Sequence, residues 1–217
     1  VVEVNEEVKN KETVAETKAE EAVSVSPTFE YEIQGDAVII TRCHQGASGA
    51  LIIPAVIEGK PVTSIGNGAF YECTNLKSIT IPDSVTSIGQ EAFRGCTGLT
   101  SITIPDSVTN IESFTFWGCS SLTSITIPDS VTSIGDRAFR DCSSLTSITI
   151  PDGVTNIGTK AFSKCSSLTT VTFLGDAPQK GEEVFNKSTP TIYRKPEAKG
   201  WEDTFAGRPV KLISEKP

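Results

Sequence analysis

Apolar residues recur along most of this chain at a fixed interval of 23 residues. Four positions keep the interval over five consecutive units, and each is always filled by the same residue type. These columns are Ile65, Ile88, Ile111, Ile134 and Ile157; Phe70, Phe93, Phe116, Phe139 and Phe162; Cys73, Cys96, Cys119, Cys142 and Cys165; and Leu76, Leu99, Leu122, Leu145 and Leu168. A constant period of this length is typical of a solenoid, in which each repeat buries its apolar face only against neighbouring repeats.

Each unit contains two apolar patterns. In the second unit, residues 101–104 alternate polar and apolar side chains, which predicts a strand. The pair Ala92-Phe93 followed by Cys96 and Leu99 has spacings of three to four residues, which predicts a short helical turn. We therefore expect an α/β solenoid whose units consist of a strand, a turn and a short helix, stacked at about 4.8 Å per strand.

The chain divides into four predicted parts. Residues 1–27 are interpreted as an acidic flexible linker or frayed helix, because the first 26 residues hold seven Glu and three Lys but no aromatic residue. Residues 28–50 are expected to form a β-hairpin cap, with Phe29, Tyr31 and Ile33 facing inward. Residues 51–173 hold one partial and five 23-residue units, and residues 174–217 are interpreted as a C-terminal cap.

The repeat motif resembles a known family. The spacing Leu99-x-x-Ile102-x-Ile104 is followed by Pro105, and most units carry Gly-x-x-Ala-Phe-x-x-Cys. With these motifs, residues 51–173 resemble the BspA-like leucine-rich repeats, also called the Treponema pallidum type. The entrance at residues 59–66 and the exit at residues 173–178 resemble that family's ends as well. The resemblance implies a leucine-rich-repeat solenoid with capped ends.

The resemblance also implies a place and a role. Members of this family are secreted or cell-surface proteins of bacteria, or occasionally of protozoan parasites, that adhere to host proteins or to other cells. The chain starts at Val1 and contains no Met, so we expect that a signal peptide was removed. A secreted or cell-surface location is therefore predicted.

Charge and hydropathy restrict the classes of partner that we expect this protein to bind. The net charge of −8 and the pI of about 4.8 argue against nucleic acid, because binding to phosphates relies on clustered Lys and Arg. No run approaches the roughly 18 to 20 apolar residues of a membrane-spanning helix, so we expect no membrane insertion.

The six cysteines are candidates for buried thiols, for disulfides and for a zinc site. Five of the six occupy one position per unit and are expected to point inward as a column of buried thiols. Pairing between adjacent units stays open, because a step of roughly 5 Å falls within the range that disulfides accept. A zinc site is disfavoured, since its ligands must converge on one point.

Other candidate chemistry is sparse. His44 follows Cys43, but neighbouring residues on a strand face opposite sides and would not form a nucleophile and base. The Asp that follows Pro in each unit is interpreted as a turn-capping residue rather than a calcium ligand. These residues are Asp83, Asp106, Asp129 and Asp152. We expect no catalytic residue, no metal and no organic cofactor, and therefore no enzyme.

Recognition is predicted where the units differ from one another. Variation is concentrated in the predicted helical segment, and it places Tyr, Trp and Arg there, the residues that dominate binding hot spots. The third unit departs most from the repeat, and its two variable aromatic side chains are expected to be exposed. The predicted binding residues are Tyr71, Arg94, Phe114, Trp117, Arg137 and Arg140.

Two other interpretations of these positions remain open. Drift on a solvent-facing surface would give the same variation. Solenoids also bind through their strands, which keeps Thr103, Thr126 and Thr149 as a second candidate surface.

The favoured function is an extracellular binding or adhesion module that recognises a protein partner, on a host cell, a neighbouring cell or the matrix. One alternative is a structural spacer with no specific ligand. A weaker alternative is carbohydrate binding through Tyr71, Trp117 and the strand hydroxyls.

Overall fold

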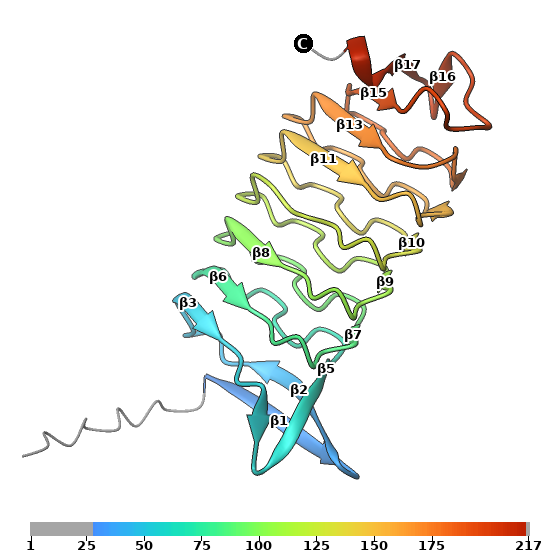
Figure 1. Cartoon of the computed structure of the whole chain (residues 1–217). Coiled ribbons are helices and arrows are strands. Elements are labelled where there is room, and N and C mark those ends of the chain that lie inside the picture. The colour runs from blue at the N-terminus through green and yellow to red at the C-terminus, as the bar shows by residue number, and fades with distance from the viewer. Residues whose placement is uncertain (1–27, 216–217) are drawn as a thin grey trace, which may run out of the picture.

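The computed structural model describes residues 28–215, which wind into an elongated solenoid (Figure 1). One turn of this solenoid is called a coil. Within this range the chain forms seventeen short strands and one 3₁₀ helix, η1 (Ile213–Glu215). The predicted solenoid is therefore confirmed. The acidic segment predicted for residues 1–27 lies outside the described residues.

One side of the solenoid carries two parallel sheets, here called the strand face. The first sheet contains β3 (Gly49–Ile52), β6 (Leu76–Thr80) and β8 (Ser101–Thr103), and the second contains β11 (Ser147–Ile150), β13 (Thr170–Phe173), β15 (Thr191–Arg194) and β17 (Arg208–Leu212). A single bridge from Thr103 to Thr126 and the coil around it lie between the two sheets. In the first sheet Ile79 lies opposite Ile102, so neighbouring strands are offset by the 23-residue period.

A second series of strands lies along the other side of the solenoid in Figure 1. It starts with β5 (Lys60–Ile65) and continues with β7 (Ser87–Ile88), β9 (Asn110–Ile111), β10 (Ser133–Ile134), β12 (Asn156–Ile157) and β14 (Gln179–Lys180). The Ile of the repeat is buried in β5, β7, β9, β10 and β12, so this series of strands closes the core on this side.

The segment predicted as a short helix is instead a chain of tight turns, and this detail of the prediction is wrong. The Phe70 N–H donates to the Ala92 carbonyl of the next coil at 2.7 Å, and the Glu72 N–H donates to the Arg94 carbonyl at 2.8 Å. Left-handed residues such as Glu72 (φ 54°) turn these N–H groups toward the neighbouring coil. We call this surface, residues 66–75 and the equivalent segments of later coils, the turn face.

The core is a stack of aromatic rings and apolar side chains. Successive Phe rings of the repeat column lie 5.2 to 5.7 Å apart between centroids, and each ring is buried. Burial of one such side chain stabilises the fold by about 1.5–3 kcal/mol. The sixth ring is Phe185, so the solenoid continues past residue 173 into the segment interpreted as the C-terminal cap.

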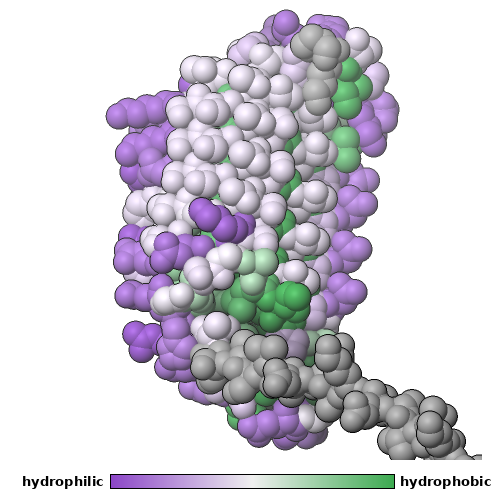
Figure 2. Space-filling view, turned by 90° about the vertical axis from the view of Figure 1, so that its left-hand side faces the viewer, coloured by the Kyte–Doolittle hydropathy of each residue, from purple (hydrophilic) through white to green (hydrophobic). Residues whose placement is uncertain are grey.

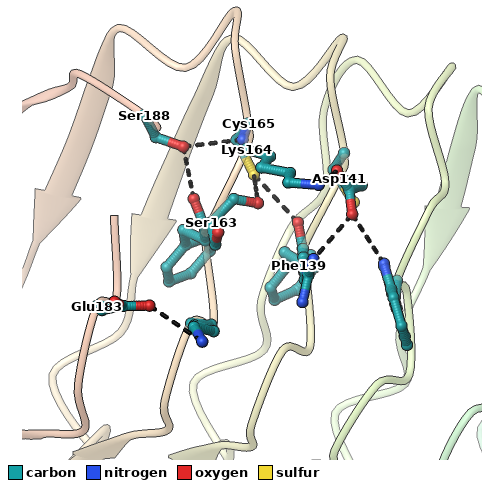
Figure 3. Close-up of polar contacts among 12 residues, drawn as sticks. Phe139, Asp141, Ser163, Lys164, Cys165, Glu183 and Ser188 are labelled. Carbon is teal, nitrogen blue, oxygen red and sulfur yellow. Dashed lines mark hydrogen bonds and ion pairs between the residues drawn. The ribbon is translucent and has the colours of Figure 1, made fainter. Parts of the chain in front are cut away.

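The cysteine column is buried beside the Phe stack. The thiols of Cys96, Cys119, Cys142 and Cys165 each contact the carbonyl oxygen of a Phe in the preceding coil at 3.0 to 3.1 Å. Figure 3 shows this contact between Cys165 and Phe139. Ser188 takes the place of Cys in the last coil, and its hydroxyl donates to the Phe162 carbonyl at 2.7 Å.

The N-terminal end is closed by the antiparallel pair β1 (Phe29–Gln34) and β2 (Ala37–Cys43), and β2 also pairs in parallel with β5. Val38 and Ile40 of β2 are buried, whereas Phe29 and Tyr31 are only partly covered. Ile33 is 39% exposed, so its predicted inward position is wrong. It lies beside the tip of the hairpin, opposite Val38.

Two further pairings complete the ends. A short hairpin is formed by β4 (Val56–Ile57) and β5. At the C-terminal end β16 (Thr204–Phe205) pairs antiparallel with β17, and the rings of Phe173, Trp201 and Phe205 pack together at 4.8 to 5.4 Å. This aromatic cluster covers the last coil.

Candidate functional site

The turn face brings the six predicted binding residues into one connected network. Arg94 lies between two aromatic rings of adjacent coils, with its guanidinium carbon 5.4 Å from the Tyr71 centroid and 4.1 Å from the Trp117 centroid. Arg140, from the coil after Trp117, lies 5.1 Å from the same Trp ring. Each such contact is attractive because the guanidinium charge faces the electron-rich ring.

A side branch of the network runs through the third unit. The Phe114 ring lies 5.6 Å from the Trp117 ring, and the guanidinium of Arg137 lies 5.4 Å from the Phe114 centroid. Phe114 has a φ of 62°, a left-handed conformation that bulky residues rarely adopt. The same column holds Glu91, Arg137 and Lys160, also left-handed, because here the backbone must turn its N–H toward the next coil.

Carboxylates that the sequence analysis did not single out hold the network in place. Asp141 accepts a hydrogen bond from Trp117 Nε1 at 2.9 Å and pairs with Arg140 Nε at 3.2 Å and Lys164 Nζ at 3.6 Å (Figure 3). Glu91 pairs with Arg94 at 3.0 Å. The sequence carries one indication of these two ion pairs, which is spacing. Glu91 lies three residues before Arg94, and Asp141 directly follows Arg140.

The aromatic side chains of the third unit are less exposed than expected. Phe114 and Trp117 are both half-buried, because guanidinium groups and a neighbouring ring lie against them. Trp117 receives one guanidinium from the coil before it and one from the coil after it, and its N–H is bound to Asp141. The ring therefore acts as a support for the arginines and has little free face of its own.

Other members of the network remain available to solvent. Tyr71 is 38% exposed at the N-terminal end of the stack. Among the described residues, no carboxylate lies within ion-pair distance of Arg137. The exposed part of Tyr71 and the Arg137 guanidinium are thus the groups that a partner could contact directly.

The strand face is regular and moderately polar. Thr103, Thr126 and Thr149 are exposed and lie in register on successive coils. Figure 2 shows a broad pale surface of this moderate hydropathy along the solenoid and a hydrophobic patch toward its N-terminal end. A pocket of about 500 Å³ lies at that end, lined by apolar residues that include Phe29, Leu51 and Pro54. The repeat pattern gave no sign of this pocket.

The cysteines, the histidine and the possible metal ligands do not come together in one reactive site within the described residues. The Cys43 thiol is buried whereas His44 is exposed. Burial raises the pKa of Cys96 and of Cys165 to about 12, which keeps these thiols protonated and unreactive at neutral pH. Within residues 28–215, no three His, Cys, Asp or Glu side chains gather as a metal site would require.

The aspartates after each Pro are exposed, and in three of the four units the following serine bonds to the previous coil. The Ser84 hydroxyl, for example, donates to the Val62 carbonyl of the previous coil at 2.7 Å. These serine contacts join adjacent coils and differ from the turn capping that was predicted for the Asp column, which stays a prediction. No helix in the described part of the chain has the length and apolar character needed to cross a bilayer.

Comparisons with known proteins identify the repeat. The description "BspA type leucine rich repeat region" fits residues 63–191 in six copies. The leucine-rich repeat protein of T. pallidum has a similar structure, with a TM-score of 0.67 and 33% identity over 74% of this chain and 86% of that chain.

A leucine-rich repeat protein from Bacteroides ovatus matches with a TM-score of 0.61 and 26% identity, over 87% of this chain but only 58% of its own. No curated protein matches the chain. Because the six copies span more than half of the sequence and coincide with the stacked coils, this protein belongs to the BspA-type leucine-rich repeat family.

Proposed function

We propose that this protein is a non-catalytic, secreted or cell-surface module that binds a protein partner through its turn face. The observation that carries the proposal is the network of Tyr71, Arg94, Trp117, Arg140, Phe114 and Arg137. Its side chains are held in place before a partner arrives. Such pre-organisation favours binding, because ordering a flexible side chain costs about 0.5–1.5 kcal/mol.

Some residues of the network hold others in place, and others are accessible to a partner. Trp117 and Asp141 fix the arginines. Tyr71 offers an exposed aromatic side chain, and Arg137 offers a guanidinium that has no ion-pair partner within residues 28–215. Tyr and Arg are enriched in the hot spots of protein interfaces. Leucine-rich repeats commonly bind proteins, which agrees with this assignment. Adhesion to a host protein, a neighbouring cell or the matrix is the form of binding that we propose.

The alternatives are less well supported. A carbohydrate ring would need a free face of Trp117 for stacking, and two guanidinium groups already lie against this half-buried ring. A structural spacer would not require a pre-organised set of aromatic and cationic side chains on one surface.

The test is a binding screen with the full chain. Purified extracellular-matrix proteins and surface glycans would be immobilised, and affinities measured by biolayer interferometry for wild type and for the double variant Tyr71→Ala, Arg137→Ala. We expect a matrix protein to bind the wild type and to bind this variant at least about tenfold more weakly, since two hot-spot side chains are removed. Far-UV circular dichroism would establish that the variant is folded.

A matched control comes from the strand face. The double variant Thr103→Ala, Thr149→Ala also truncates two exposed side chains and should retain the wild-type affinity within about twofold. Loss of binding in this control alone would move the site to the strand face. If no matrix protein or glycan binds the wild type, the spacer interpretation is preferred.

A further inference from the structure

The six cysteines occupy two different environments. Four of them, Cys96, Cys119, Cys142 and Cys165, are held by contacts from the thiol to a Phe carbonyl at 3.0 to 3.1 Å. The equivalent contact of Cys73 reaches the Cys43 carbonyl at only 4.0 Å. The thiol of Cys73, the first in the column, therefore lacks the short contact with a carbonyl that the other four thiols make.

Cys43 lies at the N-terminal end of the Phe stack, in the place that a Phe occupies in later coils. Its N–H donates to the Ala69 carbonyl, just as the Phe70 N–H donates to the Ala92 carbonyl one coil later. Its thiol contacts the neighbouring His44 carbonyl at 3.5 Å, and no Phe carbonyl is its partner among the described residues. The cap thus brings a second loosely held thiol to the start of the column.

These two thiols are also close to one another. The Cys73 thiol lies 4.0 Å from the Cys43 carbonyl oxygen, and the two thiols share a hydrogen bond that lowers the pKa of Cys73 and, together with burial, raises the pKa of Cys43. Both residues are reduced and buried. Between regular coils, by contrast, each thiol contacts a Phe carbonyl of the preceding coil at 3.0 to 3.1 Å.

We propose that Cys43 and Cys73 are an oxidisable pair that forms a disulfide between the N-terminal cap and the first repeat, while the other four thiols stay reduced. The oxidant is a small disulfide such as oxidised glutathione. One protein thiolate attacks it and releases one glutathione thiol. The second protein thiolate then attacks the mixed disulfide and releases the other, and the protein loses two hydrogen atoms in all.

A disulfide between Cys43 and Cys73 would stabilise the protein because it joins the N-terminal cap to the first repeat. The two residues are 30 positions apart, and the segment between them contains β3, β4 and β5. A cross-link of this length restricts the unfolded chain and anchors the hairpin that covers the open core. An oxidising compartment, such as the outside of a bacterium, would favour its formation.

The test uses the full chain, folded and incubated with oxidised glutathione at about pH 8. Intact mass spectrometry should show a loss of about 2 Da, and peptide mapping should join the peptide of Cys43 to that of Cys73. The melting temperature should rise by about 5 °C or more and fall back on addition of a reductant.

Variants separate this pair from the rest of the column. Cys43→Ser and Cys73→Ser should each abolish the mass loss, whereas Cys142→Ser should retain it. Ser188 shows that the column accepts a serine, so Cys73→Ser and Cys142→Ser are expected to fold, and circular dichroism checks the folding of all three variants. The proposal is wrong if the oxidised wild type keeps six free thiols, carries a lasting glutathione adduct, or maps its disulfide to another pair.

Discussion

At the residue scale, the cysteine column shows what a repeat pattern can and cannot predict. Its inward direction followed from the position of Cys73 to Cys165 in the period. The contact from each thiol to a Phe carbonyl did not follow, because it joins residues of adjacent coils whose separation depends on the turn geometry. For the same reason the sequence did not reveal that Asp141 would bind Trp117.

The buried thiols make stability dependent on pH. Cys96 has a pKa of about 12 in the folded protein because of burial, whereas an unfolded cysteine has a pKa of about 8.5. Its contribution is complete below about pH 8.5. Above that pH the unfolded state loses a proton that the folded state keeps, so the free energy of unfolding falls until about pH 12.

The effect can be isolated with one substitution. Cys96→Ser removes one such titration and keeps a donor for the Phe70 carbonyl, as Ser188 does for Phe162. Between about pH 8 and pH 10, urea unfolding should show wild type losing about 1–2 kcal/mol more than the variant. Equal losses in both proteins would mean that this thiol titrates normally when folded.

At the element scale, the strands were predictable and the turn face was not. Alternation of Ser101 to Ile104 predicts a strand in any context that buries one face. The spacing of Phe93, Cys96 and Leu99 fits a helix and a chain of turns equally well. What decides is the neighbouring coil, which takes the N–H groups that a helix would pair internally.

The stack on the turn face is expected to stabilise the coils as well as to present a surface. Trp117 contacts two guanidinium groups and donates to Asp141, so Trp117→Leu should lower the free energy of unfolding by about 1–3 kcal/mol. Tyr71→Leu removes a single, more distant guanidinium contact and should cost less than about 1 kcal/mol. Urea denaturation of both variants tests the order, and a larger effect for Tyr71 would contradict it.

At the scale of the whole molecule, the period fixes the architecture but not its ends. The sixth copy escaped the sequence analysis because Val184 and Ser188 replace the Ala and Cys of earlier units. Their side chains are buried in the same positions, so the solenoid continues. The spacing also changes there, since Thr170 lies opposite Thr191, 21 residues later. The N-terminal pocket likewise arises where the cap meets the first coil, outside the period.

Because each coil contacts only its neighbours, one whole coil should be removable if the period is kept. Deletion of residues 133–155 removes one 23-residue unit, joins Thr132 to Asn156, and brings Gly158 to the place of Gly135. The close backbone approach at Gly135 is thereby preserved. The shortened protein should fold, with the same circular dichroism per residue and a lower melting temperature.

The matched control removes one residue fewer. Deletion of residues 133–154 leaves Thr155 in the chain, so every later inward position shifts by one residue and its side chain turns toward solvent. The Phe stack would be interrupted after Phe116, and this variant should be unfolded or aggregated by circular dichroism and gel filtration. If both deletions fold equally well, coil stacking does not depend on the 23-residue register, and the physical basis assigned to the repeat is incorrect.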